Sequence, residues 1–116
     1  MKKYAVNPKE EAMQFRQGDV FVEKIDNQVR EELTEVKPDQ GRVVLAYGEV
    51  TGHAHALKAK DAKLFEVKGW VDRVLVVAKA TALMHEEHAP IELPPGTYRV
   101  KRQREYHPEE IRTVAD

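Results

Sequence analysis

The chain contains no cysteine and no serine. Without cysteine it forms no disulfide, binds no metal through a thiolate and has no cysteine nucleophile. Without serine it cannot carry out the nucleophilic chemistry of serine hydrolases. The absence of cysteine also agrees with a reducing compartment, so we expect a cytoplasmic protein.

Long apolar runs and a strong net charge are missing as well. No stretch approaches the roughly 18–20 apolar residues of a membrane span, and the first residues, Met1-Lys2-Lys3-Tyr4, lead into a polar segment rather than the apolar centre of a signal peptide. The formal net charge is −1, so no overall field attracts the chain to nucleic acid or to an anionic membrane. We therefore expect no membrane partner.

The length and composition of the chain predict one domain over residues 1–116. A chain of 116 residues can bury one modest core but not two. Hydrophobic residues make up 41% of the chain and charged residues 34%, which is polar for a globular protein but not typical of disorder. A homo-oligomer stays an open alternative to a monomer.

Short runs rich in β-branched residues predict a mainly β fold. Strands are expected near residues 19–25, 42–48, 71–78 and 97–106, with a shorter one over 63–67, because glycine and proline punctuate the connections between them. This spacing favours a barrel or a sandwich. A short N-terminal helix is expected to begin at Asn7-Pro8, since asparagine caps helices and proline suits the first helical position. Apolar residues at helical spacing favour a second short helix within 29–36.

Four of the five histidines form two close pairs. His53 and His55 are two apart, so on a strand both side chains point to the same face. His85 and His88 are three apart, which suits one helical turn or a tight loop. Imidazole is a common ligand of transition metals, and zinc needs three or four nitrogen or oxygen donors. We therefore predict that His53, His55, His85 and His88 converge on a zinc, iron, manganese or nickel ion, with Glu49, Glu86 and Glu87 as reserve ligands.

An alternative explains the same histidines without a metal. His53 and His55 would then line a polar strand face, and His85 to His88 would form a solvated acidic loop. The sequence also names no reaction: His85-Glu86-Glu87-His88 lacks the spacing of the zinc proteases, which need two histidines four apart. Whether the chain is an enzyme therefore stays open, although Glu49 or Glu86 could act as a general base on a metal-bound water.

The segment Gly48-Glu49-Val50-Thr51-Gly52-His53-Ala54-His55, followed later by Pro94-Pro95-Gly96, resembles the cupin pattern. In cupins a glycine precedes a His-x-His pair on a barrel strand, and a Pro-x-Gly turn precedes a final histidine. The resemblance implies a jelly-roll barrel in which His53 and His55 hold iron, manganese, nickel or zinc. It covers a small part of the chain, because Ala59 or Lys60 occupies the position of the expected glutamate and Arg99 that of the final histidine.

Two further hypotheses remain. The chain also resembles small uncharacterised bacterial or phage proteins. An alternative function is therefore that of a phage or bacterial assembly component that catalyses no reaction.

The last predicted strand is basic and flanked by tyrosines, so it could bind RNA or single-stranded nucleic acid through phosphate contacts and base stacking. Its candidate residues are Tyr98, Arg99, Lys101, Arg102, Arg104 and Tyr106. The simpler alternative is an exposed strand that its charge keeps soluble.

Overall fold

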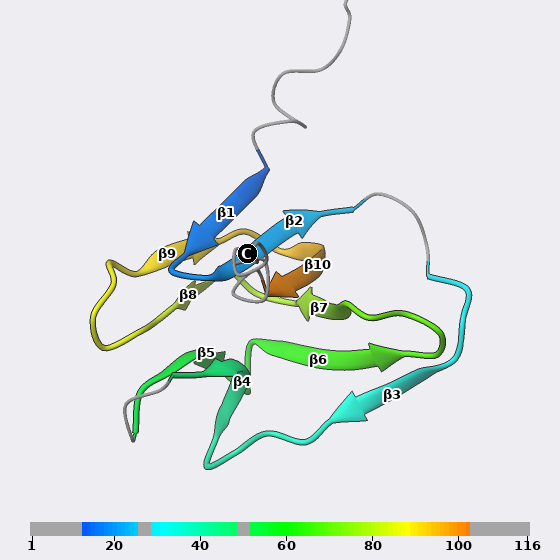
Figure 1. The fold of residues 1–116 in the computed structure, drawn as a ribbon, viewed down its shortest axis with the longest axis horizontal. Coiled ribbons are helices and arrows are strands. Elements are labelled where there is room, and N and C mark those ends of the chain that lie inside the picture. The colour runs from blue at the N-terminus through cyan, green and yellow to red at the C-terminus, as the bar shows by residue number, and fades with distance from the viewer. Residues whose placement is uncertain (1–12, 26–28, 49–51, 103–116) are drawn as a thin grey trace, which may run out of the picture.

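The computed structural model describes residues 13–25, 29–48 and 52–102, and all regular secondary structure in these residues is β (Figure 1). The strands are β1 Gln14–Gln17, β2 Val20–Lys24, β3 Leu33–Val36, β4 Arg42–Tyr47, β5 Ala54–Lys58, β6 Ala62–Val67, β7 Arg73–Val77, β8 Thr81–Leu83, β9 Ile91–Leu93 and β10 Gly96–Arg102. The predicted mainly β fold is therefore confirmed, and β2, β4, β6, β7 and β10 lie where strands were expected.

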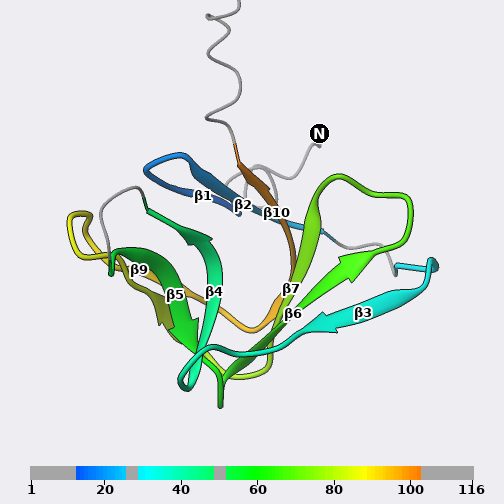
Figure 2. The same cartoon turned by 60° about the horizontal axis from the view of Figure 1, so that its bottom comes forward.

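The strands form one large sheet and two short ribbons. The large sheet is antiparallel and has six strands in the order β1-β2-β10-β7-β6-β3, and the ribbons pair β4 with β5 and β8 with β9. The outer strands β1 and β3 do not pair with each other, so the described strands do not close into a barrel. Figure 2 shows β4, β5 and β9 on one side of the molecule and β7, β6 and β3 on the other.

The core lies between the large sheet and the ribbons. Because side chains alternate along a strand, one face of β2, β10, β7 and β6 carries the buried residues of the sheet's middle, namely Val20, Val22, Tyr98, Val100, Leu75, Val77, Ala62 and Leu64. Val22 lies opposite Val100, and Leu75 lies between Tyr98 and Leu64. Residues of the ribbons pack onto this face, so all three sheets share one core, which includes Val43, Leu45, Leu57, Leu83 and Leu93.

Two arginines at the rim of this buried face tie the β4–β5 ribbon to the large sheet. Arg73 lies opposite Val100, and Arg102 lies opposite Val20, so both are on the core-facing side. Arg73 donates a hydrogen bond to the carbonyl of Leu45, and Arg102 donates one to the carbonyl of Tyr47 at 3.0 Å. The register of β4 shifts between Val44 and Ala46, and a bulge of this kind leaves a backbone group free for such a partner.

The helical predictions fare differently. The predicted helix start at Asn7-Pro8 lies outside the described residues, and where the description begins the chain is extended as β1. The predicted helix within 29–36 is wrong, because Leu33–Val36 forms the edge strand β3 and pairs with β6. Hydrogen bonds to β6 outweigh a weak helical pattern of three apolar residues. No helix in the described part of the chain has the length and apolar character needed to cross a membrane.

Candidate metal centre

A short backbone pairing between β5 and the residue after β8 brings the two histidine pairs together. Ala56 and Met84 form an isolated antiparallel bridge with hydrogen bonds in both directions, at 3.0 and 2.9 Å. In antiparallel register the next facing positions are His55 and His85, and side chains at such positions lie on the same face. The centroids of these two rings are 4.2 Å apart.

All four predicted histidines lie in one cluster. His85 is in its middle, because its ring centroid is 5.8 Å from that of His53 and 4.7 Å from that of His88. The centroids of His55 and His88 are 5.9 Å apart, and these two rings are nearly parallel. His85 and His88 stand in the loop between β8 and β9 rather than on a helical turn. His55 is buried, His53 and His85 are half-buried, and His88 is exposed.

Three side chains on the outer side of this cluster have donor atoms close enough to share an ion. His53, His85 and Glu86 each offer one nitrogen or oxygen within 4.8 Å of the others. Glu86 Oε1 accepts a hydrogen bond from the Ala54 N–H at 2.9 Å, which holds the pKa of this carboxyl below its ordinary value. The second carboxylate oxygen can therefore face a cation while the first one fixes the side chain. Glu87 Oε2 lies 3.4 Å from His53 Nδ1, whereas Glu49 lies outside the described residues.

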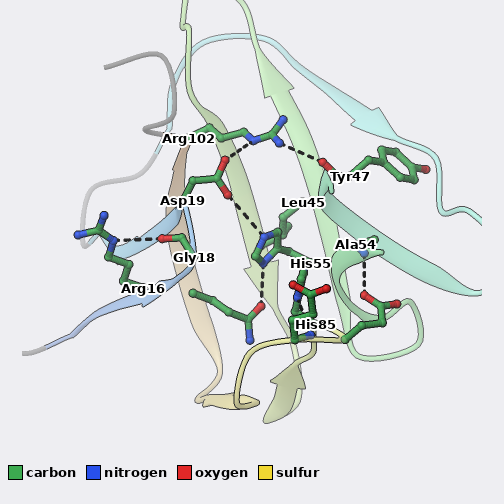
Figure 3. Close-up of polar contacts among 12 residues, drawn as sticks. Arg16, Gly18, Asp19, Leu45, Tyr47, Ala54, His55, His85 and Arg102 are labelled. Carbon is green, nitrogen blue, oxygen red and sulfur yellow. Dashed lines mark hydrogen bonds and ion pairs between the residues drawn. The ribbon is translucent and has the colours of Figure 1, made fainter. Parts of the chain in front are cut away.

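His55 is the buried member of the cluster and sits in a polar network (Figure 3). Its Nδ1 is 2.9 Å from Gln17 Oε1, and its Nε2 is 3.6 Å from Asp19 Oδ1. Burial lowers the pKa of His55 to about 4; the neighbouring His85 and His88 also lower it, and the Asp19 carboxylate raises it. The ring is therefore neutral at pH 7, which is the state in which imidazole binds metals.

The sequence did not predict that Gln17 and Asp19 belong to this site. Both residues lie at the tip of the β1–β2 hairpin, which packs against the histidine cluster. Gln17 pairs with Val20 across a two-residue turn of Gly18 and Asp19. Gly18 has a φ of +61°, which suits the first position of the tight turns that join such strands. The Gly-Asp pair between Phe15 and the apolar run from Val20 was the available signal.

The Gly18 turn also leaves room for two imidazoles. A Cβ added at Gly18 would lie 2.9 Å from His88 Nε2 and 3.2 Å from His55 Cε1, whereas at Gly41, whose φ is +80°, it would meet nothing within 4 Å.

We expect Gly18→Ala and Gly41→Ala each to lower the free energy of unfolding by about 1–2 kcal/mol, because both glycines have a left-handed backbone conformation. Only Gly18→Ala should also shift the NMR ring resonances of His55 and His88. Equal ring shifts in both variants would contradict the close packing over Gly18.

A groove beside the cluster gives it access to solvent. Its volume is about 230 Å³, and His85 and Glu86 lie at one side of it. Its other lining residues are mostly apolar or basic, namely Arg42, Ala54, Ala56, Leu57, Lys58 and Met84.

The predicted nucleic-acid strand is arranged differently from the hypothesis. Tyr98 is completely buried and donates its hydroxyl to the Pro94 carbonyl at 2.6 Å, so its ring cannot stack on a base. The three basic side chains that can be described each have an acidic partner: Arg99 pairs with Asp72, Lys101 with Glu23, and Arg102 with Asp19. Arg99 also lies over the Trp70 ring, 4.4 Å from its centroid. Arg104 and Tyr106 lie outside the described residues.

Comparison with known proteins adds a family but no function. Residues 16–103 match the model of a family described as a domain of unknown function, DUF8820. No curated protein and no solved structure matches the chain. The cupin resemblance gains no support, because the matching family is a different one and the six-stranded sheet is open.

Proposed function

We propose that this chain, which belongs to the DUF8820 family, binds a divalent transition metal ion between His53, His85 and Glu86. The observation that carries the proposal is the approach of one donor atom from each of these side chains to within 4.8 Å of the others. Donors around a tetrahedral zinc ion at about 2.0–2.1 Å lie about 3.4 Å apart. Rotation of the half-buried His53 side chain can supply this contraction without moving a strand, while Glu86 keeps its hydrogen bond to the Ala54 N–H.

The donor chemistry also fits. Two imidazole nitrogens and a carboxylate oxygen suit zinc, iron, manganese or nickel, with further positions left for water or a substrate. The three side chains come from two segments that the Ala56–Met84 bridge holds together. An ion at this position would therefore join β5 to the β8–β9 loop.

Metal binding should change one specific hydrogen bond. His85 Nδ1 accepts the backbone N–H of Glu87 at 3.0 Å, so the neutral ring carries its proton on Nε2. An ion bound at Nε2 would move that proton to Nδ1, and an ion bound at Nδ1 would replace the N–H. Either mode breaks the hydrogen bond, so we expect zinc addition to shift the Glu87 amide resonance, which is a sign of binding at this position and not elsewhere on the surface.

The proposal is tested by zinc titration of tag-free protein, with elemental analysis of the protein as purified. Glu86→Gln should weaken zinc binding at least tenfold, because the amide keeps an oxygen for the Ala54 N–H but loses the charge that the ion needs. Glu92→Gln is the matched control, since Glu92 is an exposed glutamate on β9 of the same ribbon. His85→Gln should also weaken binding. The proposal would be refuted if Glu86→Gln and His85→Gln bound zinc as tightly as the control Glu92→Gln.

A further inference from the structure

The orientation of the Gln17 side chain determines which nitrogen of His55 carries a proton. The Gln17 amide is buried, and one of its atoms lies 2.9 Å from the Leu83 carbonyl oxygen and 3.0 Å from that of Ala89. Only the NH2 group can face two carbonyl oxygens, because an amide oxygen there would meet two acceptors. The amide oxygen therefore faces His55 Nδ1 at 2.9 Å and requires a proton on that nitrogen.

With Nδ1 protonated, Nε2 of the neutral ring presents a lone pair to another acceptor. Asp19 Oδ1 lies 3.6 Å from Nε2, and the His55 side chain is only 4% exposed. The Asp19 side chain is 30% exposed, so this pair of acceptors borders solvent, and a cation or a proton between the two atoms would satisfy both. An asparagine at position 19 would satisfy both neighbours, since its NH2 group could donate to Nε2 while its oxygen accepted from Arg102. The chain has an aspartate instead.

We propose that a second divalent cation binds between His55 Nε2 and Asp19 Oδ1, with His88 as a further ligand. A separation of 3.6 Å is close to the donor–donor distance of about 3.4 Å around tetrahedral zinc. His88 Nε2 and His55 Cε1 both lie over the Gly18 turn, next to Asp19. This inference rests on the proposed metal-binding function of the cluster and extends it from one ion to two.

The second position is distinct from the first. Among the described residues, His53, His85 and Glu86 bring three donor atoms within 4.8 Å of one another, whereas the second position has two close donors, His55 Nε2 and Asp19 Oδ1 at 3.6 Å, and His88 would have to turn toward them. The His85 ring is close to both His53 and His55, with centroid distances of 5.8 and 4.2 Å. The two ions would therefore occupy neighbouring positions beside His85.

His55 and Asp19, two of the three proposed ligands of the second position, are already held in place by other residues (Figure 3). Arg102 Nε donates to Asp19 Oδ2 at 3.1 Å, which leaves Oδ1 directed at His55. Gln17 fixes the ring of His55 from its other nitrogen. Metal-binding histidines and carboxylates are commonly oriented by hydrogen bonds of this kind.

The inference is tested by zinc stoichiometry, measured by calorimetry and elemental analysis on the full chain. We expect two equivalents for the unmodified protein and one for Asp19→Asn, which retains the fold because the amide satisfies both His55 and Arg102. Asp39→Asn is the control, because Asp39 is exposed and its carboxylate accepts from Tyr47. Glu86→Gln should lose the other equivalent. The 15N resonance of His55 Nε2 should move on zinc addition in the unmodified protein and stay still in Asp19→Asn.

The outcomes separate the two proposals. If the unmodified protein binds only one equivalent of zinc, and Glu86→Gln weakens this binding while Asp19→Asn does not, the second position is overturned and the first is supported. A His55 Nε2 that carries a proton at pH 7 and does not respond to zinc would overturn the second position as well. Absence of any zinc binding at sub-millimolar concentration would overturn both.

Discussion

Replacement of Tyr98 by alanine should lower the free energy of unfolding by about 3–5 kcal/mol, the range expected for loss of a large buried aromatic side chain. Tyr98 on β10 is fully buried in the hydrophobic core. It lies opposite Leu75 on β7, and its ring centroid is 6.3 Å from that of Phe15. Because whole domains are stable by only about 5–15 kcal/mol, the alanine variant should be close to unfolding. Urea denaturation measures the loss.

Tyr98→Phe is the control for this prediction. It keeps the ring and removes only the hydrogen bond from the hydroxyl to the Pro94 carbonyl, so the expected loss is about 0.5–1.5 kcal/mol. A Tyr98→Ala variant as stable as Tyr98→Phe would show that the ring is exposed and would revive the base-stacking hypothesis.

The second large effect concerns acid. The pKa of His55 is lowered from its ordinary value of 6.5 to about 4 in the folded protein, chiefly by burial. Below pH 6.5 His55 becomes protonated in the unfolded chain but stays neutral in the folded chain. The free energy of unfolding is therefore greatest above pH 6.5 and falls as the pH drops toward 4. The loss from this group is at most about 3 kcal/mol. It is measured by urea denaturation of metal-free protein between pH 7 and pH 4.

His55→Gln isolates this contribution. Glutamine does not titrate, so the variant should lose less stability than the unmodified protein over the same pH interval, whatever its stability at pH 7. Carboxylates elsewhere titrate in both proteins and cancel in the comparison. Identical pH slopes for the two proteins would contradict the buried, neutral state of His55.

The strands were predictable where local chemistry specifies them. Val74-Leu75-Val76-Val77 is apolar and mostly β-branched, which favours a buried strand, and it is part of β7 at the centre of the large sheet. Leu33–Val36 was not predictable in this way, because its residues are mostly exposed and form an edge strand only through pairing with β6. Edge strands have weak patterns because one face and one side of the backbone meet water.

The basic strand shows where alternation alone misleads. The sequence correctly places Tyr98, Val100 and Arg102 on one face of β10, but it does not say which face meets the core. The registers with β2 and β7 bury this face, so Tyr98 becomes a core residue. Arg102 at the rim becomes a link between Asp19 and the β4–β5 ribbon.

The sequence by itself determined the two histidine pairs, and it predicts a shared face for His53 and His55 from the two-residue periodicity of a strand; in the structure His53 lies one residue before β5. The approach of the pairs to each other was decided by the tertiary structure, through one bridge between Ala56 and Met84, 28 residues apart in the chain. Asp19 and Gln17 joined the cluster for the same reason, since a hairpin more than 30 residues upstream of His55 packs against it. Hydrogen bonds between distant backbone segments depend on the whole fold, and no local pattern of residues encodes them.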